Sequence, residues 1–128
     1  MKDKYTYFTK PDPVTKYRHL GQPVYVINFD ITEKEKEQSD EPTSWECYTV
    51  ELPPAVWDYG VIVDKIITTY YPNDKMWAIL NNYMLDQSDE QNLQEYNAMQ
   101  ERRAWAKQTA KDLMAYAEKN GIIEYSDE

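Results

Sequence analysis

The chain has 128 residues, of which 41% are hydrophobic and 14% aromatic, and its formal net charge is −9 at pH 7. This length suits one domain spanning residues 1–128, large enough to bury a core and fold unaided. The negative charge disfavours generic binding to nucleic acid or to anionic membranes, because those partners require a positive field.

Cysteine content and hydropathy exclude several further classes. Cys47 is the only cysteine, so neither an internal disulfide nor a cysteine-based zinc site is expected. No apolar run follows the first residues as it would in a signal peptide, and no stretch reaches the ~18 apolar residues of a membrane helix. We therefore expect a protein of the cytoplasm, or of a particle assembled there, with no membrane contact.

Residues 1–56 are expected to form strands and loops. Tyr5–Thr9 is rich in β-formers, Val24–Ile31 alternates apolar and polar side chains, and Trp45–Leu52 repeats that alternation. Between the two longer strands, residues 33–41 carry five acids and two lysines. Such a segment cannot bury apolar surface, which predicts a mobile acidic loop joining the strands as a hairpin.

Residues 57–120 are expected to be helical. The first helix is indicated by apolar residues at helical spacing, although the β-branched run at 61–63 is also compatible with a strand. Pro72 should end this helix, and Asn73 is placed to cap a second one over Asp74–Leu85. The buried stripe expected for the second helix consists of Met76, Ile79, Leu80 and Tyr83.

A third and longest helix should close the chain. Ser88 with Gln91 matches a capping box at its start, and Asn120–Gly121 should end it after Lys119 in a Schellman motif. Residues 121–128 form a short tail in which 122–125 are compatible with a strand. A seam of nearly three heptads runs along the helix through Tyr96, Met99, Arg103, Ala106, Ala110, Leu113 and Ala117. Together the elements predict an α+β fold, with a small antiparallel N-terminal sheet packed against a C-terminal helical hairpin.

Apolar side chains also lie beside the main stripes of the last two helices. Trp77 flanks the stripe of the second helix, and Ala98, Trp105 and Tyr116 flank the seam of the third. Large aromatic side chains in such positions are enriched at protein interfaces. These four residues are therefore a possible protein interface, for another protein or for a second copy. The alternative is that the aromatic rings fill the side of the core that faces the sheet.

A basic ridge lies on the third helix. Arg103, Lys107 and Lys111 follow one another at intervals of one helical turn, with Arg102 beside them. One interpretation is a small regulatory module that contacts the phosphates of nucleic acid. The other is a solvated face whose cations lie toward the C-terminal end of the helix dipole. The acidic net charge and the lack of a helix-turn-helix pattern disfavour nucleic acid.

No catalytic, metal or cofactor site is predicted. His19, the only histidine, lies in the loop-like stretch Tyr17–Gly21 with no partner marked for acid–base chemistry. Cys47 within a strand is typical of a small buried hydrophobe. The carboxylates at 86–90 lack calcium-loop spacing. We therefore expect a non-enzymatic protein with no cofactor and no small-molecule substrate.

Three segments have a recognisable pattern, and they read WDYGVIVDKII at 57–67, YYPNDKMWAILNNY at 70–83 and EYNAMQERRAWAK at 95–107. Together they resemble small accessory proteins encoded in phages and prophages of Bacteroides-type bacteria, and helical ends of proteins near tail and tail-fibre genes. The resemblance covers about residues 57–115. It implies an accessory or structural role in a phage particle or its assembly, and it transfers no active-site residues.

Overall fold

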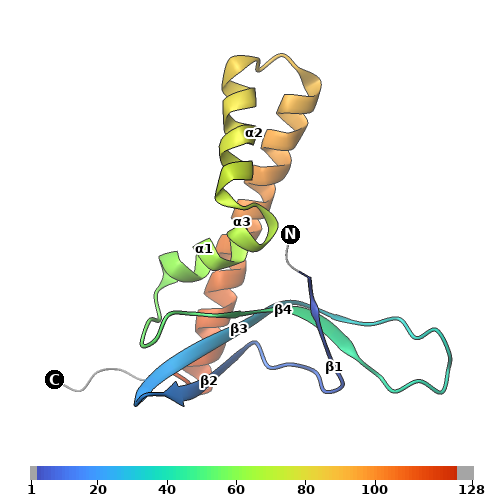
Figure 1. Cartoon of the computed structure of the whole chain (residues 1–128), viewed down its shortest axis with the longest axis vertical. Coiled ribbons are helices and arrows are strands. Elements are labelled where there is room, and N and C mark those ends of the chain that lie inside the picture. The colour runs from blue at the N-terminus through green and yellow to red at the C-terminus, as the bar shows by residue number, and fades with distance from the viewer. Residues whose placement is uncertain (1–2, 124–128) are drawn as a thin grey trace.

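The computed structural model describes residues 3–123 and has an N-terminal antiparallel sheet followed by three helices (Figure 1). This confirms the predicted α+β class with a long final helix. The elements are β1 (Tyr5–Tyr7), β2 (Val14–His19), β3 (Gln22–Glu33), β4 (Trp45–Glu51), α1 (Tyr59–Tyr70), α2 (Asn73–Leu85) and α3 (Glu90–Lys119).

The four strands lie in the order β1-β4-β3-β2, and every neighbouring pair is antiparallel. The sequence prediction missed β2, because only Val14 of that edge strand is buried and no alternation of apolar residues marks it. Of the stretch Tyr17–Gly21, the first three residues therefore belong to a strand and not to a loop. Leu20 and Gly21, with φ of 52° and 78°, form the tight turn that joins β2 to β3, as left-handed backbone does in hairpins.

The central hairpin of β3 and β4 matches the prediction, although β3 is longer than expected. A bulge interrupts its register between Phe29 and Thr32, where Asp30 takes a φ of 55°. The acidic segment lies in the connection between the two strands, beginning after Glu33, and the backbone N–H of Lys34 donates to the carbonyl of Ser44 at 2.8 Å. The first strand, β1, is shorter than the predicted Tyr5–Thr9, since it ends at Tyr7.

One face of the sheet packs against α1 and the C-terminal part of α3 (Figure 1). The sheet contributes Tyr25, Ile27 and Phe29 from β3 and Tyr48 and Val50 from β4 to one buried cluster with the helices. The C-terminal part of the heptad seam of α3, from Ala106 to Ala117, belongs to this cluster, and its small side chains let the helix pack closely. The buried members of the whole seam are Met99, Ala106, Ala110, Leu113 and Ala117, whereas Arg103 is exposed.

The helix ends follow local hydrogen bonding, with two corrections. The second helix begins at Asn73, which is therefore its first residue and not its cap. Pro72 occupies the N-cap position, and no side chain makes a capping hydrogen bond there. Asp89, not Ser88, caps α3, and its carboxylate accepts from the Asn92 N–H at 3.0 Å. Aspartate is as good a cap as serine, and the Ser88 hydroxyl instead donates to Asp86 at 2.6 Å. The run at 61–63 is helical.

The Schellman motif at the end of α3 is confirmed. The Ile122 N–H donates to the Ala117 carbonyl at 2.9 Å, and the Gly121 N–H donates to Glu118 at 3.2 Å. Gly121 has a φ of 64°, the left-handed conformation that this motif needs. Residues 122 and 123 form no strand, and the remainder of the strand proposed at 122–125 lies outside the described residues.

The second helix and residues 90–102 of α3 form a helical arm that rises away from the sheet (Figure 1). The rings of Tyr83 and Tyr96 stack between the two helices with centroids 3.9 Å apart. Near the tip, the Asn92 side-chain amide donates to the carbonyls of Asn82 at 3.1 Å and Asp86 at 3.3 Å. These contacts join the two helices where no sheet supports them.

Tyr70, the last residue of α1, contacts both the sheet and α3. Its hydroxyl donates to the Asp30 carboxylate at 3.0 Å. Its ring meets those of Tyr48 and Trp105 edge-on at 5.3 and 5.6 Å, and the Arg102 guanidinium lies 4.2 Å from its centroid. Burial, followed by the bond to Asp30, raises the pKa of the Tyr70 phenol.

Replacing Tyr70 should show how much its hydroxyl contributes to stability and how that contribution depends on pH. At pH 7, Tyr70→Phe deletes one hydrogen bond and is expected to lower the free energy of unfolding by about 1 kcal/mol. With a raised pKa, the folded phenol holds its proton above pH ~10 while the unfolded one loses it, so wild-type stability falls as pH rises. The variant should therefore lose less stability than wild type in urea unfolding between pH 7 and about 11. An equal alkaline loss in both proteins contradicts the assignment. Tyr5→Phe, which makes the same change at an exposed site, is the control.

The close packing of α3 on the buried cluster can be tested at Ala110, which is fully buried. Ala110→Leu should overpack this contact and lower the free energy of unfolding by about 1–3 kcal/mol. Ala104→Leu adds the same side chain on the exposed face of the helix and should change stability by less than about 0.5 kcal/mol. Equal effects in chemical denaturation would show that α3 does not pack closely through this residue.

Candidate functional site, a groove between three helices

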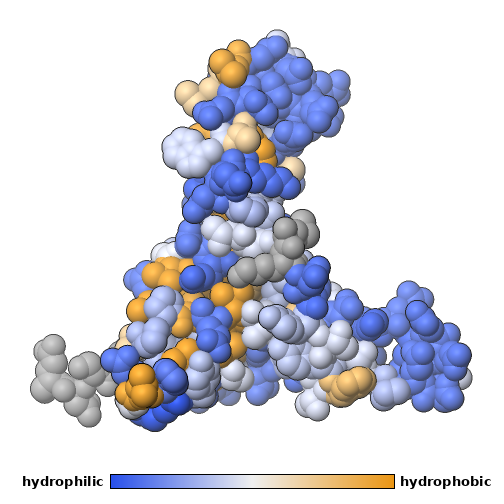
Figure 2. Space-filling view, in the orientation of Figure 1, coloured by the Kyte–Doolittle hydropathy of each residue, from blue (hydrophilic) through white to orange (hydrophobic). Residues whose placement is uncertain are grey.

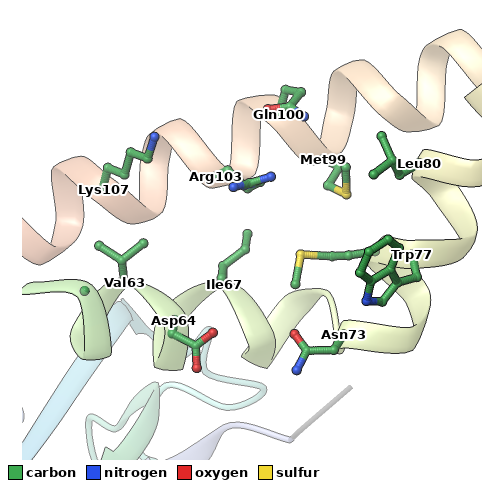
Figure 3. Close-up of a pocket in the computed structure, with 12 residues that line it drawn as sticks. Val63, Asp64, Ile67, Asn73, Trp77, Leu80, Met99, Gln100, Arg103 and Lys107 are labelled. Carbon is green, nitrogen blue, oxygen red and sulfur yellow. The ribbon is translucent and has the colours of Figure 1, made fainter. Parts of the chain in front are cut away.

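A hollow of about 400 Å³ lies where α1, α2 and α3 meet (Figure 3). We call it the helix groove. Its apolar lining comes from all three helices and consists of Val63, Ile67, Met76, Trp77, Leu80 and Met99. Around this lining lie Asp64 on the α1 side and Arg103 and Lys107 on the α3 side (Figure 3).

The break at Pro72 explains why a hollow forms here. Proline cannot continue a helix from within, so α1 ends at Tyr70 and α2 leaves in a new direction along α3. The apolar stripes of α1 and α2 therefore approach α3 from different directions, and their side chains do not fill the space between them. Gly60 adds no side chain at the α1 end of the groove.

Trp77 is the most unusual residue of the groove, because 64% of its surface is exposed. Tryptophan carries a large apolar area that proteins normally cover. On the same arm, Met84, Leu85 and Leu93 are exposed by 66%, 85% and 40%, and apolar surface is visible at the top of the arm in Figure 2. The arm thus presents apolar side chains both at the groove and at its tip.

The groove carries a local positive charge on an acidic protein. Arg103 and Lys107 lie one helical turn apart, and both are exposed. Within residues 3–123, neither forms an ion pair. A guanidinium beside an ammonium is suited to bind carboxylates, since arginine donates two parallel hydrogen bonds to such a group.

The four residues predicted as a protein interface do not lie on one surface. Trp77 lines the helix groove, whereas Ala98 lines a separate hollow on the arm together with Tyr71 and Ile79. Trp105 is half-buried against the ring of Tyr70, and Tyr116 packs against the core. Trp105 and Tyr116 therefore follow the alternative in which aromatic rings fill the core.

The predicted basic ridge is also divided. Arg102 is half-buried, with its guanidinium 4.2 Å from the ring centroid of Tyr70 and 4.8 Å from that of Trp105. Arg103 and Lys107 line the groove, and Lys111 is exposed one turn further along. Arg102 thus supports the aromatic core, and only Arg103 and Lys107 belong to the candidate site.

The groove has no signature in the sequence, although several of its residues stand out there as apolar positions of the helices. Met76, Leu80 and Met99 were assigned to buried stripes, and their spacing is the same whether a stripe is covered or lines a hollow. The helix break at Pro72 was the one available signal, since it predicted a change of direction. The angle of that change depends on contacts that are distant in the sequence.

His19 and Cys47 lie apart from the groove. His19 is exposed at the end of edge strand β2. Cys47 is fully buried, and burial raises the pKa of its thiol, which keeps it in the unreactive protonated form. Cys47 adjoins a small polar network. In it, the Thr49 hydroxyl donates to the Asn28 side-chain oxygen at 2.7 Å and forms a second hydrogen bond, of 2.8 Å, with the Tyr7 hydroxyl.

Across residues 3–123, no three His, Cys, Asp or Glu side chains are grouped so that they would hold a metal ion. In the same part of the chain, no helix has the length and hydropathy needed to cross a bilayer. No family model, curated protein or solved structure matches the chain.

Tryptophan substitutions should separate the groove from the core. Trp77→Ala is expected to change the free energy of unfolding by less than about 1 kcal/mol, because the ring is mostly exposed. Trp105→Ala should lower it by about 2–4 kcal/mol, since it removes the contacts with Tyr70 and Arg102. The measurement is urea denaturation followed by circular dichroism. A large loss in the Trp77 variant would show that this ring is needed for folding rather than available for binding.

Proposed function

We propose that this protein is a non-enzymatic interaction module that binds protein through the helix groove. The observation that carries the proposal is Trp77, a largely exposed ring beside an apolar hollow bordered by Arg103 and Lys107. Tryptophan and arginine are the residues that contribute most often to the energetic centre of protein interfaces. An apolar lining with a charged border is also the usual arrangement of such a centre.

The shape of the groove supports a protein ligand. It is open to solvent along the arm and is bordered by three helices (Figure 3), so it fits side chains projecting from another folded surface. Its polar groups are Asp64, Asn73, Gln100 and the two cations. That set contains neither a nucleophile paired with a base nor two adjacent carboxylates, which are the arrangements used by common hydrolases.

The resemblance over residues 57–115 supports a place for this activity. It covers the three helices that form the groove, and it suggests an accessory or structural part in a phage particle or its assembly. Under this proposal the protein acts in the cytoplasm or in a particle assembled there. Nucleic acid is a weaker choice of partner, because the net charge is −9 and Arg102 is held over aromatic rings.

Site-directed photo-crosslinking tests the proposal. A photoreactive phenylalanine analogue at position 77 should yield a defined protein adduct in cells that produce the protein. Adding Arg103→Glu should reduce that adduct at least about tenfold, since it reverses a charge at the border of the groove. The same analogue at Leu20, an exposed side chain on the β2–β3 turn, is the control for random contact. The groove does not bind protein if positions 77 and 20 give the same adducts, or if Arg103→Glu leaves the yield of the position-77 adduct unchanged.

A further inference from the structure

The tip of the helical arm has a surface that complements the helix groove. We define the arm apex as residues 84–93, the end of α2, the connecting turn and the start of α3. It exposes three apolar side chains, those of Met84, Leu85 and Leu93. We infer that the arm apex of one copy docks in the helix groove of another copy, so that the partner of the groove is the protein itself.

Charge complementarity selects this occupant. The apex carries three exposed carboxylates beside its apolar side chains, those of Asp86, Asp89 and Glu90. Hydrogen bonds from Ser88 hold the pKa of Asp86 below its usual value, so its charge persists at neutral pH. The groove presents the opposite charge, through Arg103 and Lys107, on a molecule whose net charge is −9. Opposite charges on two surfaces of one chain favour contact between those surfaces and disfavour other orientations.

Size and apolar character agree with the charges. The groove has a volume of about 400 Å³, within the range of about 300–1,000 Å³ that holds a drug-sized ligand. The side chains of Met84 and Leu85 are together smaller than such a ligand. They are exposed by 66% and 85%, and docking would cover them together with Trp77. Covering exposed apolar surface on both sides supplies the driving force.

The apex is also held in one conformation before any contact. The Asn92 amide donates to two carbonyls at the end of α2, Asp86 accepts from the N–H of Ser88 at 3.1 Å as well as from its hydroxyl, and Asp89 caps α3. A turn ordered in this way loses little conformational entropy on binding. Connecting segments ordinarily expose polar residues, so a hydrogen-bonded turn that directly follows the exposed Leu85 of α2 fits a contact surface.

This geometry determines the kind of assembly. The apex and the groove are different surfaces of the chain, so each copy can offer one to a first neighbour and the other to a second. Such contacts can be reciprocal, which gives a two-fold dimer, or head-to-tail, which gives a larger ring or an open chain. The inference deepens the proposed function, because it rests on the groove as a protein-binding site and specifies the partner.

Two complementary variants of the full-length protein test the inference. Leu85→Gln replaces an apolar side chain of the apex with a neutral polar one and leaves the groove intact. Arg103→Glu with Lys107→Glu reverses the charge of the groove and leaves the apex intact. All three side chains are exposed, so both proteins should fold, which circular dichroism and thermal melting verify. Leu20→Gln and Lys10→Glu make matched changes at exposed sites away from both surfaces.

Sedimentation velocity across a dilution series gives the readout. The wild type and both controls should show a mass that rises with concentration, and salt should weaken this association. Each variant alone should associate at least about tenfold more weakly, the effect of losing a central interface contact. An equimolar mixture should form a heterodimer and nothing larger, because it contains one intact apex and one intact groove in each pair.

Three results would overturn the inference. They are a wild type that stays monomeric up to near-millimolar concentration, an apex variant that associates like the wild type, and a mixture of the two variants that stays monomeric. A monomeric wild type that still forms an Arg103-dependent adduct from position 77 with another protein refutes self-docking but leaves the proposed function standing. A monomer with no such adduct refutes both.

Discussion

The contacts of Tyr70 join the end of α1 to both the sheet and α3, and the placement of the helical arm follows from them. As the last residue of α1, it bonds to Asp30 at the bulge of β3 and places its ring against Trp105 and Arg102 of α3. It thereby holds the end of α1 between the sheet and the long helix. An aromatic ring with one polar tip suits this position, because it fills apolar space while its hydroxyl satisfies a carboxylate that is itself only one-third exposed.

The arm is a consequence of that contact and of Pro72, which follows two residues later. With the end of α1 held at the sheet, the chain cannot continue the helix and must start α2 in another direction. A helix that packs on only one other helix leaves apolar side chains on its flanks. Here they are Trp77 beside the groove and Met84 and Leu85 at the apex. The exposed apolar surface therefore follows from the architecture of the arm.

Electrostatics gives that apolar surface its specificity. The chain is strongly acidic, which favours solubility and opposes indiscriminate association. Arg103 and Lys107 introduce a positive border at the groove, whereas the apex ends in carboxylates at 86, 89 and 90. In the docking that we propose, apolar contact provides the attraction between copies, and the two sets of charges determine which surfaces meet. This division of labour is common in protein interfaces, where charge contributes more to specificity than to affinity.

The sequence by itself determined the α+β class, the three helices, the central hairpin and the Schellman end at Gly121, because periodicity and end signals act over a few residues. It did not reveal β2, since an edge strand with one buried side chain lacks alternation. It also could not separate Trp77 from Trp105, although both flank an apolar stripe. Only the tertiary structure placed Trp105 in the core and Trp77 at the groove, because the angle between helices depends on contacts such as that of Tyr70 with the sheet, far apart in the chain.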